Sequence, residues 1–275
     1  MAARGFVLTF HSHNISGNDY ATNDHVALDR SLALLERLRI PVLRLLDVAR
    51  RLRARTFERL PQRFACVTFD DGSDYDWRDL EFPGHGRQPS MQAVLRSHSK
   101  RLLGVLWMRR AHATSFVIAS PRARAEIAAA ALGDAALMGD SWWRAAQRSG
   151  LVDIGTHGWN HVHPASSEMA AHPDLVERFD RIATRAQAEL QVDRAFEAIH
   201  AAAGGDAGRI FAYPYGQVSE FLAAEYLPSQ ERIVAAVGVE PRPLAADCDP
   251  WRIPRYVCGP DWSSDAGLEA IVAAG

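Results

Sequence analysis

The sequence alternates between short apolar segments and longer segments of helical periodicity over its whole length. Seven apolar runs rich in β-branched and aromatic residues are candidate strands: Phe6–Phe10, Phe64–Phe69, Ala113–Ile118, Val152–Gly155, Ile210–Tyr213, Ile233–Val237 and Ile253–Val257. Seven segments between them have helical spacing or composition: Val26–Leu38, Val42–Arg53, Met91–Leu103, Arg122–Leu132, Ser141–Arg148, Pro173–Leu190 and Ser219–Tyr226. Strands that alternate with helices form a parallel sheet covered by helices. Because no break divides the pattern, we predict an α/β fold in which residues 1–275 form a single domain, a distorted (β/α) barrel of about seven parallel strands.

Composition limits the possible partners. The chain is 48% hydrophobic over 275 residues, enough for a substantial core, and its formal net charge is only -2. It therefore has no basic field to attract nucleic acid or anionic lipid. No apolar run is long enough to span a membrane, and the run that follows Gly5 is too short for the core of a signal peptide. We expect a cytoplasmic protein without a nucleic-acid partner or a membrane span, and its oligomeric state stays open.

The three cysteines do not form a disulfide framework. Cys66 belongs to an apolar run and is expected in the core, whereas Cys248 and Cys258 are near enough in sequence to pair. A cytoplasmic location argues against that pair.

Three long loops begin where candidate strands end. They are 12–23, 72–89 and 158–171, and they contain most of the chain's clustered polar residues. Ligands bind at the carboxyl edge of the strands in a parallel barrel. The functional site is therefore expected in these loops.

Two adjacent carboxylates, Asp70 and Asp71, follow the run Phe64–Phe69. Two neighbouring negative charges at the end of a buried strand repel one another and lose solvation unless something uses them. A metal ion would use both, because one carboxylate can bind it while the other takes a proton from a water molecule at the metal. The alternative is a surface Asp-Asp-Gly turn, and this pair on its own favours that alternative.

Two histidines four residues apart, His157 and His161, follow the run Val152–Gly155. Imidazoles at this spacing can bind one ion of zinc or a neighbouring metal, and the glycines at 155 and 158 favour a loop over a helix. Two histidines and one aspartate leave coordination positions open for water and substrate. The alternative is chance, because the chain contains 11 histidines.

The segment from Arg209 to Gly216 indicates a third element of the site. Pro214 fixes its own φ and Gly216 lets the chain turn, so this strand end can direct a backbone N–H into a site. The alternative is an ordinary aromatic strand that ends in a turn. Four aromatic side chains can either stack on a sugar ring or belong to the core: Tyr75, Trp77, Trp159 and Trp262.

Together, the three segments resemble the polysaccharide deacetylases, the NodB-homology family or carbohydrate esterase family 4. The chain has Thr-Phe-Asp-Asp-Gly ending at Gly72, then His-x-x-x-His from His157, then Phe-x-x-Pro-Tyr-Gly ending at Gly216, in that family's order. The resemblance extends from about Phe64 to Asp265. It implies the same distorted barrel.

The resemblance also implies roles for individual residues. Asp70 would be the general base, and Asp71, His157 and His161 would bind a divalent metal, with zinc first and cobalt, nickel or manganese as alternatives. The backbone N–H of Tyr215 would stabilise the oxyanion. Further residues are expected to contact substrate: Tyr213, Pro214, Trp159, Arg255, Asp261 and Trp262.

The chain departs from the family at several positions. Gly158 replaces a usual Ser or Thr, and Ala212 replaces an arginine that orients the base. We expect Arg255 to take over from that arginine, with Arg209 and Arg252 as alternatives. Asp261 and Trp262 look like the family's later Asp-Trp element without its arginine partner.

The family's late histidine, which protonates the leaving group, is also missing, because no histidine follows His200. His11 and His13 follow the first strand, so we predict that one of them is the general acid. The alternatives are that both are loop histidines bonded to solvent or backbone, or that water or Asp70 carries the proton.

The expected activity is metal-dependent hydrolysis of an N-acetyl or related acyl group on a sugar or polysaccharide. The substrate would be a carbohydrate or a small acylated amine. Two alternatives are a deacylase or deformylase of a small, non-polymeric amide and a metal-binding pseudoenzyme that binds carbohydrate without turnover. An intact Asp70 disfavours the second, because a metal cage alone does not need another carboxylate.

Overall fold

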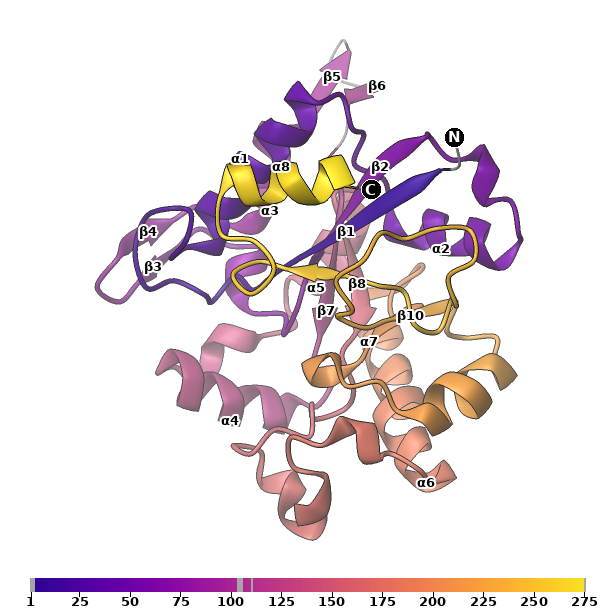
Figure 1. Cartoon of the computed structure of the whole chain (residues 1–275). Coiled ribbons are helices and arrows are strands. Elements are labelled where there is room, and N and C mark those ends of the chain that lie inside the picture. The colour runs from indigo at the N-terminus through magenta and orange to yellow at the C-terminus, as the bar shows by residue number, and fades with distance from the viewer. Residues whose placement is uncertain (1–2, 103–105, 110, 275) are drawn as a thin grey trace.

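The computed structural model describes residues 3–102, 106–109 and 111–274, and its main feature is one seven-stranded sheet (Figure 1). The strands are β1 Arg4–Phe10, β2 Arg63–Phe69, β7 Ala113–Val117, β8 Val152–Thr156, β9 Ile210–Ala212, β10 Ala235–Val237 and β11 Tyr256–Val257. Their order is β10-β9-β8-β7-β2-β1-β11, and every neighbouring pair is parallel. The predicted distorted barrel of seven parallel strands is therefore confirmed.

The segment that contains β11 spans the gap between the two edges of the curled sheet. Tyr256 and Val257 pair with β1, whereas Ile253 pairs with Val237 of β10. The run predicted as one strand, Ile253–Val257, is thus divided between the two edges. Arg255 lies between the two pairings.

Helices cover the outside of the sheet. They are α1 Asp24–Arg37, α2 Leu45–Arg53, α3 Met91–Ser97, α4 Pro121–Leu132, α5 Trp143–Ser149, α6 Arg185–Ala188, α7 Ala195–Ala203 and α8 Asp265–Ala274. Local chemistry sets their ends: in α4 the side chain of Ser120 accepts a hydrogen bond from the backbone of Ala123, Pro121 takes the first position, and Gly133 ends the helix with φ 75°. Figure 1 shows α8 lying beside α1, and α4 and α6 at the opposite end of the molecule.

Three predicted helices were too long. The helix from Met91 ends at Ser97, and a hairpin of β5 Lys100–Leu102 and β6 Leu106–Arg109 follows it; Leu103 lies outside the described residues. Val42 pairs with Ala65, so α2 begins only at Leu45. Residues 173–181 form short 3₁₀ turns, and regular helix begins at Arg185. A second hairpin, β3 Leu80–Phe82 with β4 Gly86–Gln88, projects from the loop after β2.

The central strands are buried on both faces, as parallel strands under helices must be. In β1, Phe6, Leu8 and Phe10 pack towards α1, whereas Val7 belongs to a second cluster that fills the barrel with Phe116. Cys66, Cys248 and Cys258 are buried and free, in line with the expectation of no disulfide. Among the described residues, no helix is long and apolar enough to cross a membrane.

Candidate active site

Residues from the carboxyl ends of β1, β2, β8 and β9 line one cavity of about 320 Å³. The polar lining consists of His11, His13, Asp70, Asp71, His157, His161, His163 and Tyr215. The parallel strands bring these side chains together from positions as far apart in sequence as 11 and 215. The candidate site therefore lies at the edge where ligands bind in this class of fold.

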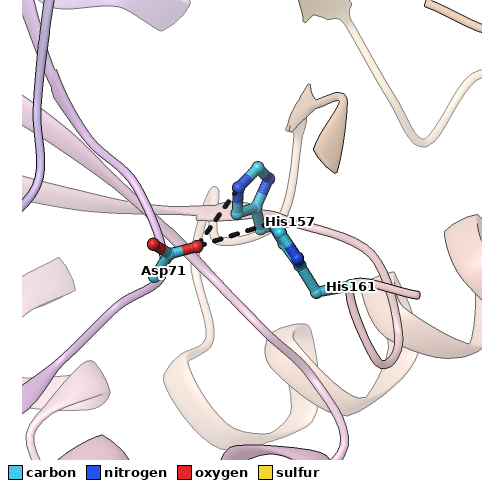
Figure 2. A group of neighbouring side chains, drawn as sticks. All are labelled: Asp71, His157 and His161. Carbon is cyan, nitrogen blue, oxygen red and sulfur yellow. Dashed lines mark ion pairs between the residues drawn. The ribbon is translucent and has the colours of Figure 1, made fainter. Parts of the chain in front are cut away.

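Asp71, His157 and His161, which line the cavity, point towards one another (Figure 2). Oδ1 of Asp71 lies 3.6 Å from Nε2 of His157 and 3.5 Å from Nε2 of His161. One ligand atom from each residue lies within 4.8 Å of the others. These separations suit three ligands around one small cation, with further coordination positions open to the cavity.

The protonation of the three side chains also suits a divalent cation. Nδ1 of His157 lies 2.9 Å from the carbonyl oxygen of Ala212 and donates to it, so Nε2 keeps its lone pair. Burial, together with His157, lowers the pKa of His161 to about 3, which leaves a neutral imidazole. Burial alone would raise the pKa of Asp71, but the surrounding histidines, His161 foremost, hold it below its ordinary value. This trio therefore offers the neutral imidazole of His161, the ionised carboxylate of Asp71 and Nε2 of His157, the ring nitrogen that does not bond to Ala212.

The backbone at the site adopts conformations that L residues usually avoid. Asp71, His161, Val162 and Tyr215 have left-handed φ of 73°, 59°, 45° and 58°. Such strain persists only where surrounding structure enforces it, and it is common at functional sites. Gly72 also has φ 72°, and a Cβ there would lie 2.6 Å from Cγ1 of Val117. The predicted Asp-Asp-Gly segment is thus a tight turn that presses against β7.

Asp70 points into the barrel and pairs with Arg255. Nη1 and Nη2 of Arg255 donate to the two carboxylate oxygens of Asp70 at 2.7 and 2.9 Å, and Nε donates to the carbonyl oxygen of Gly238. Burial alone would raise the pKa of Asp70, but the charge of Arg255, with a contribution from His157, lowers it. Asp70 is therefore ionised, and its Oδ2 lies 3.9 Å from Nε2 of His157 beside the trio.

His11 and His13 lie at the β1 side of the cavity, with their rings 5.8 Å apart. Nε2 of His13 is 3.7 Å from Oδ2 of Asp71, and burial lowers the pKa of His13. The backbone N–H of His11 donates to Asp24, whose own pKa burial raises to about 6. Nδ1 of His11 is buried without a hydrogen-bond partner among the described residues.

A family model for polysaccharide deacetylases matches residues 58–231, well over half of the chain. The chain belongs to the polysaccharide deacetylase family. None of the curated protein sequences matches it significantly.

Solved structures of deacetylases share the fold of this family member. The Streptococcus pyogenes deacetylase PplD in complex with acetate is 14% identical, with a TM-score of 0.66 over 99% of both chains. IcaB from Ammonifex degensii is 19% identical, with a TM-score of 0.65 over 99% of this chain and 98% of that one. A de-N-acetylase from Aggregatibacter actinomycetemcomitans is 16% identical, with a TM-score of 0.64 over 98% and 99%.

The structure accounts for two positions at which the chain departs from the family pattern. Arg255, and neither Arg209 nor Arg252, contacts Asp70: Arg252 pairs with Glu220, and Arg209 donates to the carbonyl oxygen of Glu231. Gly158 has φ 77°, and a Cβ there would lie 3.1 Å from Oε1 of Gln191, which accepts the N–H of Trp159. A serine would be strained at this position.

Several residues expected to contact substrate are buried in this family member and pack in its core. Tyr213 is fully buried and donates to the carbonyl oxygen of Trp251; Trp262 packs edge-on against Phe10 and donates to Tyr20. Trp159 is 8% exposed and lies under the guanidinium of Arg194.

The remaining expected contacts, Pro214 and Asp261, are also held by neighbouring structure, as are Tyr75 and Trp77, for which stacking on a sugar and packing in the core were both open. Asp261 accepts the backbone N–H of Val257, Pro214 is buried, and Tyr75 donates to the carbonyl oxygen of Glu81. Trp77 stacks on Trp142. None of these side chains lines the cavity, because each is held by packing or by a hydrogen bond elsewhere.

Sequence reasoning missed two groups at the site. His163, to which the sequence analysis assigned no role, lines the cavity, and its Nδ1 accepts the backbone N–H of Ala165. Asp76 is buried within the loop after β2; burial raises its pKa to about 7, and Ser115 donates to it. Neither has a spacing that distinguishes it from an ordinary loop residue.

Proposed function

We propose that this chain is a metal-dependent deacylase that removes an N-acetyl or related acyl group from an amino sugar or polysaccharide. One observation carries the proposal: Asp70, ionised and oriented by Arg255, lies beside the trio of Asp71, His157 and His161 in a single cavity. Family membership supports deacetylation of a sugar. The S. pyogenes deacetylase of the same fold holds acetate, a product of such a reaction.

The trio is suited to zinc, with cobalt, nickel or manganese as alternatives, because it combines imidazole with carboxylate. When bound, such a cation would lower the pKa of a water molecule and polarise the acyl oxygen. Asp71 supplies the negative charge, and His157 is fixed in the required tautomer by Ala212.

Asp70 acts as the general base in this proposal. It takes a proton from the attacking water, whose oxygen bonds to the acyl carbon. The two hydrogen bonds from Arg255 hold the carboxylate in place and keep it ionised. The backbone N–H of Tyr215, held by the left-handed turn after β9, donates to the oxyanion that forms on the acyl oxygen.

The leaving amine receives its proton from the β1 side, from the imidazolium form of His13 or His11, and solvent exchange then returns a proton to the histidine and removes the one on Asp70. The C–N bond then breaks and yields a carboxylic acid and a free amine. An amine needs this proton far more than an activated aryl oxide does. Replacing either histidine with Gln should therefore slow amide cleavage more than cleavage of an aryl ester, while metal content stays the same. Equal losses on both substrates, or no loss for either variant, would remove the histidines from this role.

A small acylated amine is the second candidate substrate. The aromatic residues expected to stack on a sugar, Trp159 and Trp262 among them, are held in the core and do not line the cavity. A pseudoenzyme is disfavoured by the buried pairing of Asp70 with Arg255, which a metal cage alone does not require.

The direct test is hydrolysis of N-acetylglucosamine oligomers and of small acetamides with added zinc, cobalt, nickel or manganese ions. Release of free amine is measured for wild type and for Asp70→Asn, which keeps the shape of the side chain but cannot accept the proton. We expect Asp70→Asn to lose roughly two to four orders of magnitude in kcat and to keep its metal. A variant with near-wild-type activity would show that another group activates the water.

A further inference from the structure

The cavity has an aliphatic wall that the reaction itself does not need. Five side chains form it: Ile118, Ile127, Ala131, Leu132 and Met138. They come from the end of β7, from α4, and from the 3₁₀ turn Ala135–Met138. We call this set the α4 wall. Four of the five, Ile118, Ile127, Leu132 and Met138, also belong to one hydrophobic cluster.

The side chains of the α4 wall differ in their exposure to solvent. Ile118, Ile127 and Met138 are buried, Leu132 is half-buried, and Ala131 is exposed. Ile127 and Ala131 are four residues apart and so share one face of α4, about 6 Å apart along the helix axis. The wall is thus an apolar surface that includes buried and solvent-exposed side chains, in the same cavity as Asp71, His157 and His161.

A buried arginine keeps the α4 wall in place. Nη1 of Arg124 donates to the carbonyl oxygens of Ile118 and Ala119, and Nη2 donates to Asp140. Its guanidinium lies 4.5 Å from the ring centroid of Trp143. These contacts fix α4 against the end of β7, so the wall is pre-formed, as binding pockets usually are.

The proposed reaction assigns this wall to one part of the substrate. The acyl carbon becomes tetrahedral and carries four groups: the oxyanion, the attacking oxygen, the amine and the acyl substituent. The oxyanion faces Tyr215 after β9, the attacking oxygen faces Asp70 after β2, and the amine faces His13 after β1. The direction left for the acyl substituent is towards β7, the strand between β2 and β8. That is the side on which the α4 wall lies.

We propose that the α4 wall binds an acyl chain longer than acetyl, of about butyryl to hexanoyl size. An acetyl group has a single methyl to place there and would leave most of the wall exposed to water. Each further methylene that the wall covers should raise kcat/KM about fourfold. This inference rests on the proposed deacylase function and adds the class of acyl group to it.

The test compares N-acetyl-, N-butyryl- and N-hexanoylglucosamine as substrates of the metal-loaded protein. We expect kcat/KM to rise with chain length. In Ala131→Phe the added ring occupies the space in which a long acyl chain would lie against the wall. The ratio of kcat/KM for the hexanoyl substrate to kcat/KM for the acetyl substrate should therefore fall at least tenfold. Ala129→Phe is the matched control, because Ala129 is exposed and lies two residues away on another side of α4. It should keep the wild-type ratio.

A binding measurement separates this inference from the proposed function. Acetate, butyrate and hexanoate are the acids that the three substrates would release, and their affinities are measured by calorimetry. Tighter binding with length in wild type, but not in Ala131→Phe, supports the wall even if no substrate is cleaved, in which case only the deacylase proposal fails. Cleavage that is fastest for the acetyl substrate, with carboxylate affinity independent of length, overturns the wall and leaves the deacylase proposal standing.

Discussion

Asp70 and Arg255 meet inside the barrel, where water cannot solvate their charges. Arg255 is fully buried and Asp70 is 5% exposed. Besides Asp70, the guanidinium binds Gly238 and Thr68, and it lies over the ring of Phe116 at 5.5 Å. A buried pair of this kind becomes costly when one partner is removed, because the other keeps a charge without compensation.

We therefore predict that Arg255→Met lowers the free energy of unfolding by about 3–5 kcal/mol. Deacylation should also fall, because Asp70 loses its orientation, and Arg255→Lys should recover part of the stability but not the two-point contact. Arg252→Met is the control, since Arg252 pairs with the exposed Glu220. It should change stability by no more than about 1 kcal/mol in chemical denaturation. Similar losses for Arg255→Met and Arg252→Met would contradict this account of the pair.

At the scale of single residues, sequence spacing predicted which polar side chains cluster better than which aromatic side chains line the cavity. An aspartate at a strand end and two histidines four residues apart form a pattern with few other functions. In the structure, one ligand atom from each of Asp71, His157 and His161 lies within 4.8 Å of the others. Tyr213, Trp159 and Trp262 suit a core as well as a binding wall, and the structure places them in the core. Spacing cannot reveal which of these surfaces an aromatic ring covers.

At the scale of elements, the loop between His157 and His161 depends on a glycine. Gly158 has φ 77°, near the left-handed region that other residues occupy only at a cost. Its absent Cβ also leaves room for Gln191, which binds Trp159 and Asn160. The loop is therefore shaped by Gly158 and Gln191 together.

We predict that Gly158→Ser, which restores a residue usual in the family, weakens metal binding and lowers the free energy of unfolding by about 1–2 kcal/mol. Gly133→Ser is the matched control: Gly133 has φ 75°, but a Cβ there meets nothing within 4 Å. Both variants should lose similar stability in chemical denaturation. Only Gly158→Ser should bind metal more weakly by titration, and equal metal affinities would refute the role of this loop.

The presence of the strands and helices was easier to predict than the residues at which they begin and end. Alternating periodicity identified the seven strands, because parallel strands buried on both faces are continuous apolar runs. It gave no sign that Ile253–Val257 would pair with β10 at one end and β1 at the other. That division depends on how far the sheet curls, which is a tertiary property. The α4 wall was missed for a similar reason, since an alanine-rich helix does not reveal which face meets a cavity.

At the scale of the whole molecule, a cluster of charged side chains lies at the amino ends of β8 and β9, whereas the candidate site lies at the carboxyl ends of the strands. Arg44 donates to Asp153 at the start of β8 and to Asp206 before β9, and His112 lies 3.7 Å from Asp153. Burial alone would raise the pKa of Asp153, but His112 and Arg44 lower it to about 2. The cluster is therefore stabilising while Asp153 is ionised.

This cluster predicts a dependence of stability on pH. The folded pKa of Asp153 lies below the unfolded value of about 3.9, so its contribution is present above pH 4 and is lost as pH falls towards 2. Wild type should exceed Asp153→Asn by about 2 kcal/mol in the free energy of unfolding near neutral pH, and the gap should close between about pH 4 and 2. Asp47→Asn removes an exposed partner of Arg44, and its free energy of unfolding should differ little from that of wild type at any pH. A gap for Asp153→Asn that does not change down to pH 2 would rule out this contribution.

The central claim is that Asp71, His157 and His161 bind one divalent metal, and metal content measured by elemental analysis tests it most directly. Wild type is reconstituted with zinc and compared with His157→Ala and with His172→Ala, a nearby exposed histidine outside the trio. Folding of all three is checked by circular dichroism. We predict one zinc per chain in wild type and in His172→Ala, and none in His157→Ala. A folded His157→Ala that retains its zinc, or a wild type that binds none, would contradict the account.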